Sequence, residues 1–333
     1  MFIFRVLLFS LLTLFIFSCE NEVDINAEFE ETTVVFGLLN HNADTQFVKI
    51  NKTFLDNETS AIDLAKDPDR LFYDTLEVSL IDTELEIEIP LQKIERSKED
   101  GIFTQERNEV FFTTRRLRKN TEYELKIIKP DSSITQGKTI TMDTILIEKP
   151  RLNLSQANTV IFFNQNQQFN PYIFEFKTGK NIAEFQATAF FRYTEILPGG
   201  DSVLRKIEIP ISSFSNSSLA ENRVFQFRFE GERFFNIIER EVPATANPTK
   251  KIVEGKNNFE IEIFAADEDL WFFRSLNGPI EGLNQVRPEF TNLENGIGLF
   301  SSRLTVREFS QLDNNTRNFL VGEFNSDRGF SFP

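Results

Sequence analysis

Short runs of alternating apolar and polar residues recur along most of this 333-residue chain. In residues 84–91, Leu85, Ile87 and Ile89 alternate with glutamates, so the pattern predicts a strand with one buried face and one solvated face. The runs that indicate strands in the first part of the chain are 32–40, 46–54, 75–82, 84–91, 109–114, 122–129 and 133–142. About seven short strands within about 115 residues are typical of an antiparallel sandwich.

A second series of such runs begins after a pause in the pattern at residues 147–156, where we place a domain boundary. These runs are 158–164, 172–177, 184–196, 202–211, 223–230 and 258–266. Two glycines in residues 197–201 predict a hairpin turn, because glycine adopts the positive φ that such turns require. Residues 267–276 begin with acidic side chains and carry an arginine near their end, which favours a helix. Residues 231–241 and 311–324 are further helix candidates.

Residues 117–133 carry a leucine, a turn and then Thr-x-Tyr, which resembles the late strands of fibronectin type III and related immunoglobulin-like domains. The resemblance implies that Leu117 fills the core, that the Tyr123 hydroxyl ties the corner, and that residues 129–133 form the next hairpin. Residues 56–72 do not fit a plain sandwich, and we expect a short helix and a loop there. The predicted fold is therefore mainly β, with an immunoglobulin/fibronectin-III-like sandwich followed by a second β-rich domain with a few short helices.

The core of this chain has to form without an internal disulfide, because Cys19 is the only cysteine. The chain contains 38 phenylalanines, and each buried ring removes a large apolar area from water. Acidic residues outnumber basic residues by 51 to 36, which gives a formal net charge of −15. Such a surface repels nucleic-acid phosphates and anionic lipid head groups, so we expect neither as a partner.

The first residues predict export and attachment to a membrane. Residues 2–17 are nearly all apolar, with Arg5 as their only charge, which is typical of a signal peptide and short for a membrane span. Ile16, Ser18 and Cys19 resemble the lipobox of bacterial lipoproteins, in which the signal is cut before a cysteine that carries diacylglycerol. Several acyl chains on Cys19 would hold the protein on a membrane surface. An ordinary signal peptide or an uncleaved anchor helix is the alternative.

An asparagine-rich turn near the C-terminus leads into a Gly-x-Phe strand. Its residues are Asn292, Asn295, Gly296, Gly298 and Phe300. Together with the opening run at 32–40, this turn resembles a family of Bacteroidota outer-membrane lipoproteins of unknown function. The resemblance implies an outer-membrane lipoprotein that faces the cell surface beside a TonB-dependent transporter, with no catalytic residue assigned. The acidic side chains of Glu20, Glu22 and Asp24 match in kind the surface-export signal of that phylum.

These inferences divide the chain into five parts. They are a lipoprotein signal peptide (1–18), an acidic tether (19–31), an immunoglobulin-like sandwich (32–148), a second β-rich domain with short helices (149–324) and a C-terminal tail (325–333).

Residue patterns that carry catalysis are sparse. His41 is the only histidine and lies in a polar turn, so it cannot supply a His-based zinc cluster. Lipid on Cys19 would remove the only thiol. Asp67, Asp69 and Asp74 are oxygen ligands that calcium uses, but the glycine and the closing glutamate of a calcium loop are missing. We therefore predict no catalytic residue, no metal and no cofactor.

Two features are candidates for binding. Trp271 with its neighbours Phe272 and Phe273 could stack on a sugar, although aromatic residues at helical spacing more often pack in a core. The long polar loop at 276–296 is the preferred contact region, because such loops carry recognition on a rigid scaffold. Trp271, Asn292 and Asn295 are the predicted binding residues.

The leading functional hypothesis is a non-enzymatic, lipid-anchored surface protein that binds a protein or glycan partner in nutrient capture beside an outer-membrane transporter. A carboxylate-based glycan hydrolase is one alternative, because plentiful acidic residues could form an acid–base pair. A structural or adhesive component of the envelope is the other alternative.

Overall fold

The computed structural model describes residues 30–55, 59–150, 159–215, 220–278, 289–325 and 327–333. Residues 32–333 form one compact unit. The predicted signal peptide, Cys19 and the tether up to residue 29 lie outside the described residues. Within the described ranges, no helix is both long and apolar enough to cross a membrane.

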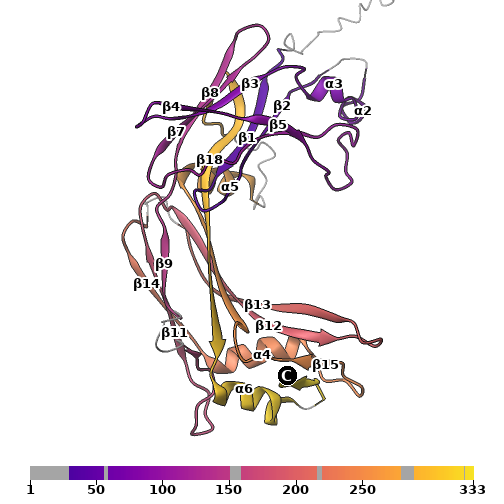
Figure 1. Cartoon of the computed structure of the whole chain (residues 1–333), viewed down its shortest axis with the longest axis vertical. Coiled ribbons are helices and arrows are strands. Elements are labelled where there is room, and N and C mark those ends of the chain that lie inside the picture. The colour runs from indigo at the N-terminus through magenta and orange to yellow at the C-terminus, as the bar shows by residue number, and fades with distance from the viewer. Residues whose placement is uncertain (1–29, 56–58, 151–158, 216–219, 279–288, 326) are drawn as a thin grey trace, which may run out of the picture. The chain divides into compact units, whose positions relative to one another are not determined.

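Two sheets form an immunoglobulin-like sandwich, as the sequence predicts (Figure 1). The strands on one side are β1 (Thr33–Leu39), β2 (Gln46–Lys52), β6 (Glu109–Thr113) and β5 (Gln92–Glu95), and those on the other are β8 (Ile134–Ile140), β7 (Glu122–Ile128), β3 (Glu77–Asp82) and β4 (Ile87–Pro90). Their orders match the A-B-E-D and G-F-C orders of immunoglobulin-like domains, with β4 as an added edge strand. Val35, Val48, Leu80 and Leu125 share one buried core between the two sheets.

The predicted corner of the sandwich is confirmed. Leu117 is buried in the core, and the Arg118 backbone N–H donates to the Tyr123 hydroxyl at 2.9 Å. The turn at residues 129–133 joins β7 to β8, and the Lys129 N–H donates to the Ser133 carbonyl at 3.0 Å. The motif was recognisable because all of its partners lie within about twenty residues of chain.

The C-terminal segment completes the sandwich on both sides. β17 (Leu293–Glu294) pairs with β8, and the first half of β18 (Gly296–Leu312) pairs in parallel with β1. The second half of β18 pairs antiparallel with β16 (Phe259–Ala266). The sandwich therefore contains these C-terminal residues in addition to residues of the predicted range of 32–148, whose last residues, from Ile145, belong to a strand of a separate sheet. One continuous long sheet runs through β18 from β16 to β1.

The remaining strands and helices enclose a second core that is rich in phenylalanine. The long sheet continues into β12 (Glu184–Ile196), β13 (Ser202–Ser215), β15 (Lys250–Ile252) and β19 (Phe330–Ser331), while β10 (Thr159–Val160) pairs with β18. A small sheet contains β9 (Ile145–Lys149), β11 (Tyr172–Thr178) and β14 (Val224–Phe229). Rings of Phe162 and Phe234 stack with centroids 4.4 Å apart, so aromatic packing stabilises this region without disulfides.

The predicted helices and the predicted hairpin are confirmed. The helices are α4 (Gly231–Glu241), α5 (Glu268–Asn277) and α6 (Asn314–Val321), followed by a 3₁₀ turn at Glu323–Asn325. Asp267 caps α5 by accepting from the Leu270 N–H at 3.0 Å. In the β12–β13 hairpin, Gly199 and Gly200 have φ values of +136° and +94°. Phe259, Ile261 and Ile263 are fully buried on one face of β16, as their alternation predicts.

The strand predicted at residues 84–91 is wrong in its first half. β4 begins only at Ile87, and Leu85 lies in the turn that leads from β3, with 52% of its surface exposed. The cause is Asp82, whose side-chain oxygen accepts the Glu84 and Leu85 N–H groups at 3.2 and 3.1 Å. This local bond favours a turn over a continued strand. Only Ile89 of the three predicted core residues is buried.

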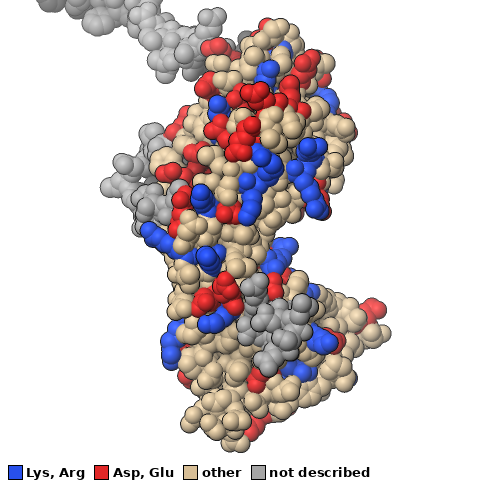
Figure 2. All heavy atoms as spheres, turned by 60° about the vertical axis from the view of Figure 1, so that its left-hand side comes forward, with Lys and Arg blue, Asp and Glu red and all other residues tan. Residues whose placement is uncertain are grey.

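Charged side chains of both signs are interspersed over the sandwich on the face shown in Figure 2. On the same face, uncharged residues predominate over the region below the sandwich. The excess of acidic residues therefore does not form a single negative patch on this face.

Candidate binding site

Two short helices lie beside β2 on the outer face of the sandwich. They are α2 (Ala61–Leu64) and α3 (Pro68–Leu71), which confirm the helix and loop predicted at residues 56–72. Asp67 caps α3 by accepting from the Asp69 N–H at 3.0 Å, and Pro68 is the first helical residue. Leu71 and Phe72 then follow as buried side chains, so the end of α3 presents an apolar surface beside β2.

Side chains along β1 and β2 alternate between the sandwich core and the outer face of the sheet. Val35 and Val48 point into the sandwich core, whereas Phe36, Lys49 and Asn51 point outward. Phe36 is 45% exposed, although its ring lies 5.8 Å from the ring of Phe273 in α5, measured between centroids. This outer face is therefore both aromatic and cationic.

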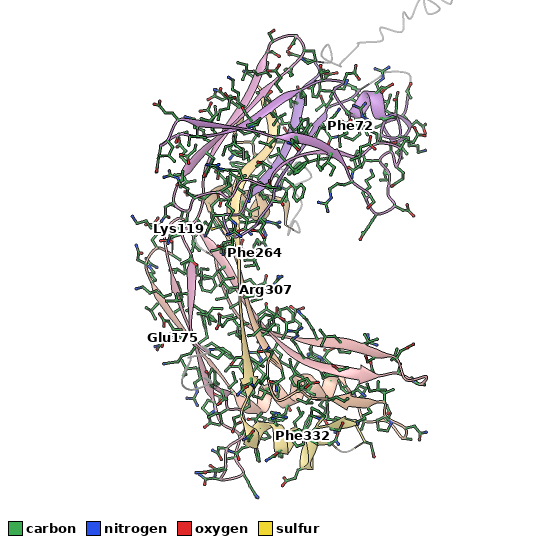
Figure 3. The ribbon with its side chains drawn as sticks, in the orientation of Figure 1. Phe72, Lys119, Glu175, Phe264, Arg307 and Phe332 are labelled. Carbon is green, nitrogen blue, oxygen red and sulfur yellow. The ribbon has the colours of Figure 1, made fainter. Side chains whose placement is uncertain are left out.

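A cavity of about 580 Å³ lies on this outer face and is the candidate binding site. Its lining comes from β1, β2, α3 and the segment between β5 and β6. The lining residues are Val34, Phe36, Lys49, Asn51, Lys52, Thr53, Phe54, Leu71, Phe72, Lys98, Phe103 and Asn108. Figure 3 shows Phe72 beside α3 in this part of the molecule. The volume is within the range of roughly 300–1,000 Å³ that small-molecule sites occupy.

Lys49 is a partly buried cation of the cavity lining. Its ammonium group donates to the Asn108 side-chain oxygen at 2.6 Å and to the Glu109 carbonyl at 2.8 Å, and it lies 4.5 Å from the centre of the Phe72 ring. Burial and the nearby charge of Lys98 lower the pKa of Lys49 from 10.5 to about 8. Lys49 therefore keeps its positive charge at neutral pH in a partly desolvated place.

The opposite wall of the cavity belongs to the segment that joins β5 to β6. Phe103 is 53% exposed, and the Lys98 ammonium donates to the Phe103 carbonyl at 3.2 Å. The Thr104 N–H donates to the Ala65 carbonyl at 2.8 Å, which ties this segment to the end of α2. The cavity therefore lies between this segment and the residues around α2 and α3, and a hydrogen bond joins the two parts.

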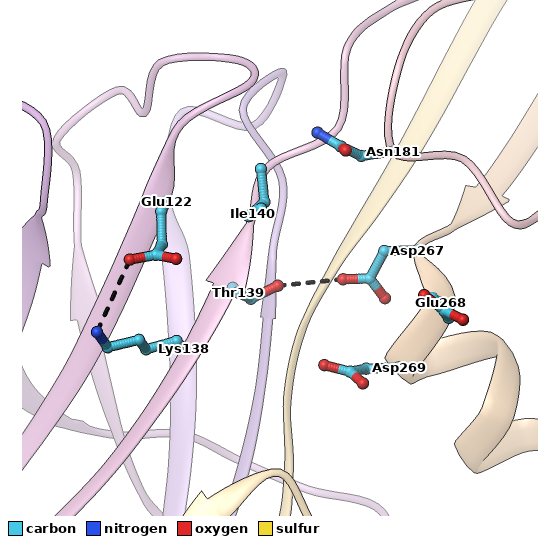
Figure 4. A pocket seen from close by; sticks show the side chains of 8 residues that line it. All are labelled: Glu122, Lys138, Thr139, Ile140, Asn181, Asp267, Glu268 and Asp269. Atoms are coloured by element: carbon cyan, nitrogen blue, oxygen red, sulfur yellow. Dashed lines mark hydrogen bonds and ion pairs between the residues drawn. The ribbon is translucent and has the colours of Figure 1, made fainter. Parts of the chain in front are cut away.

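A second cavity, of about 350 Å³, lies between β8 and the start of α5 and is rich in carboxylates (Figure 4). Asp267 in this cavity accepts four hydrogen bonds, from the Leu270 N–H, the Ser301 hydroxyl, the Ser302 N–H and the Thr139 hydroxyl. Burial raises the pKa of Asp267 to about 6. These bonds occupy both of its oxygens and join α5 to β8 and β18, so Asp267 acts as a structural anchor.

The binding residues predicted from the sequence line neither cavity. The Trp271 indole N–H donates to the Ser215 hydroxyl, and the ring lies 6.3 Å from that of Phe272. The Asn292 side chain bonds to the backbone of Phe300 at both its oxygen and its nitrogen, and Asn295 donates to the Ile134 carbonyl at 3.0 Å. Both asparagines therefore hold the β17–β18 turn against the sandwich. Their role in binding stays a prediction.

Two further sequence predictions concern parts outside the described residues. Cys19 is one of them, and residues 279–288 of the preferred contact loop are the other. Of the three aspartates considered for calcium, Asp67 caps α3 and Asp69 lies 3.7 Å from Arg107. Within the described ranges, no group of three or more His, Cys, Asp or Glu side chains is arranged to hold a metal ion.

Sequence reasoning missed the aromatic and cationic cavity. The signal that could have found it is the position of Phe36 and Phe47 on the solvent side of alternating strands, where polar residues are expected. A second signal is the insertion at residues 56–72, which had no role in a plain sandwich. Neither signal shows that the insertion folds back over the outer face of β2.

Comparison of the chain with protein-family models and with curated proteins found no match. The resemblance to the Bacteroidota lipoprotein family therefore stays a prediction.

Proposed function

We propose that this chain is a lipid-anchored binding protein of the outer membrane. In this proposal, acyl chains on Cys19 hold the protein at the membrane, and the cavity beside β2 of the sandwich binds a ligand. The observation that carries the proposal is this ring-lined cavity of about 580 Å³ on the outer face of β1 and β2. A cavity with a mainly apolar lining and a few placed polar groups is typical of small-molecule sites. The role proposed for this cavity is binding, and the polar groups of its lining are lysines, asparagines and one threonine.

The cavity is tested with Nile red, a neutral apolar dye that becomes fluorescent in apolar surroundings. We expect saturable binding of about one dye per protein, which Phe103→Glu abolishes by placing a charge on the apolar wall. Leu204→Glu is the matched control, because Leu204 on β13 is 54% exposed and Phe103 is 53% exposed. Absence of saturable binding, or equal binding by the Phe103→Glu variant, contradicts the proposed site.

The anchor is tested separately in cells. We expect Cys19→Ala to move the protein from the membrane fraction to the soluble fraction, and globomycin to block maturation of the unchanged protein. Surface exposure predicts that protease added to intact cells digests the anchored protein. A Cys19→Ala variant that still fractionates with membranes contradicts the lipid anchor.

The partner is part of the same proposal, which places the protein in nutrient capture beside a TonB-dependent transporter. A pull-down from detergent-solubilised outer membrane tests it. Recovery of a transporter with the unchanged protein is the expected outcome, and its absence counts against this role while leaving the cavity and the anchor to their own tests.

A further inference from the structure

The cavity beside β2 contains two ammonium groups that lack a carboxylate partner. Among the described residues, neither Lys49 nor Lys98 makes an ion pair, and their acceptors are an amide oxygen and backbone carbonyls. The nearby carboxylate of Glu109 is already shared by Arg107 at 2.7 Å and Lys93 at 3.0 Å. In a chain with a net charge of −15, two such cations at the edge of one cavity are unexpected.

Both ammonium groups have donor hydrogens left for a ligand. An ammonium group has three N–H donors, of which Lys49 uses two and Lys98 uses one in the described part of the chain. Asn51 and Asn108 each donate one of their two amide N–H groups to a backbone carbonyl, of Leu71 and Arg96 respectively. Lys49 and Lys98 are therefore charged donors that a polar ligand group would meet in this cavity.

The two lysines also repel each other where water is partly excluded. Burial and the charge of Lys98 lower the pKa of Lys49, which shows that its charged form lacks full compensation. A ligand anion between them would supply that compensation, because charge-assisted hydrogen bonds are stronger than bonds between neutral groups. A ligand cation would add to the repulsion.

Apart from Lys49, Lys52 and Lys98, the lining has no charged side chain and is dominated by rings and aliphatic side chains. Phe36, Phe72 and Phe103 approach the cavity from β1, the end of α3 and the segment between β5 and β6. Leu71 and Val34 add aliphatic surface. Such a lining favours an apolar body, whose burial contributes roughly 25 cal/mol per Å² of apolar surface.

On the basis of the proposed function, we infer that the cavity binds a small amphipathic carboxylate, with its head group between Lys49 and Lys98 and its apolar body against the phenylalanines. The occupant is a single small anion with an apolar chain or ring. The charge of the two lysines and the size of the cavity support this ligand over a neutral apolar molecule.

The test compares three probes with the same chain: dodecanoate, dodecanol and dodecyltrimethylammonium, each below its micelle concentration. Isothermal titration calorimetry on the unchanged protein is expected to show dodecanoate binding at least tenfold more tightly than the other two. Lys49→Met and Lys98→Met are each expected to weaken dodecanoate about tenfold, the loss that one charge-assisted hydrogen bond implies. Lys177→Met, at an exposed lysine on β11, is the matched control and is expected to bind like the unchanged protein.

Nile red binding separates this inference from the proposed function. If Nile red binds but dodecanoate shows no preference, or neither lysine variant weakens it, the anion assignment is overturned and the cavity stands. If Nile red does not bind either, the proposed site itself fails. Displacement of Nile red by an acidic peptide but not by dodecanoate also overturns the small-ligand assignment. Circular dichroism checks that each variant folds, and Lys98→Met carries the test if Lys49→Met does not fold.

Discussion

Replacing Gly298 with alanine tests whether β18 completes the sandwich. Gly298 has a φ of +113°, a conformation that L-amino acids rarely adopt, and it pairs with Val35 where β18 runs parallel to β1. A Cβ atom at this position would lie 2.1 Å from the Val35 carbonyl oxygen. Because the contact is with backbone, no side-chain rotation relieves it, and the two strands have to separate.

The expected cost is large and can be divided into two parts. The unfavourable backbone conformation costs about 1–3 kcal/mol for a residue with a side chain. Overpacking against a fixed neighbour costs a further 1–3 kcal/mol, roughly. We therefore expect Gly298→Ala to lower the free energy of unfolding by roughly 2–6 kcal/mol.

Urea unfolding followed by far-UV circular dichroism measures this change. Gly101→Ala is the matched control, because no heavy atom lies within 4 Å of the Cβ position at Gly101. The control is expected to stay within about 0.5 kcal/mol of the unchanged protein. A Gly298→Ala variant as stable as the control would refute the pairing of β18 with β1 as the reason for this glycine.

Three further outcomes are expected. Tyr123→Phe removes the acceptor of the Arg118 N–H, so the free energy of unfolding in urea should fall by about 1–2 kcal/mol, and no change would contradict the corner bond. Burial raises the pKa of Asp267 from 3.8 to about 6, so the folded protein binds a proton at Asp267 more tightly than the unfolded chain does. The free energy of unfolding should therefore fall by about 3 kcal/mol as the pH rises from 3.8 to about 6. Urea titrations at several pH values test this slope, which Asp267→Asn should flatten. Phe300→Ala should cost about 3–5 kcal/mol in the same assay, because the ring is fully buried in the sandwich core, and a smaller loss would show that the core collapses around the gap.

Local patterns predicted many elements of the fold, although not β5, β9 or the second half of β18. The three longer helices, the glycine-containing hairpin and the Tyr123 corner each depend on residues close together in the chain, so the sequence contains their complete signal. The error at Leu85 also comes from residues close together in the chain. One hydrogen-bonding side chain, that of Asp82, favours a turn and outweighs the alternation that follows it. Local signals conflict where two structures are both possible, and the alternation alone does not show which prevails.

The candidate site was not predictable in the same way. Its walls come from β1, from the residues around α3 and from the segment between β5 and β6, and no local pattern states that these segments meet. The asparagines that were predicted to bind a ligand instead hold the β17–β18 turn by hydrogen bonds to Phe300 and Ile134. Exposed polar residues in a turn look alike in sequence whether they serve a ligand or the backbone.

The sequence by itself determined many of the strands and their buried faces, such as Phe259, Ile261 and Ile263 on β16, since period-two alternation is a property of neighbouring residues. It also determined that the core would be aromatic and free of internal disulfides, because these follow from composition. Only the tertiary structure decided that β18 lies beside β1 and that lysines from β2 and from the segment between β5 and β6 line one apolar cavity. The physical reason is that pairing between distant segments is selected by the packing of the whole chain, in which the space left beside Val35 admits a glycine and no larger residue.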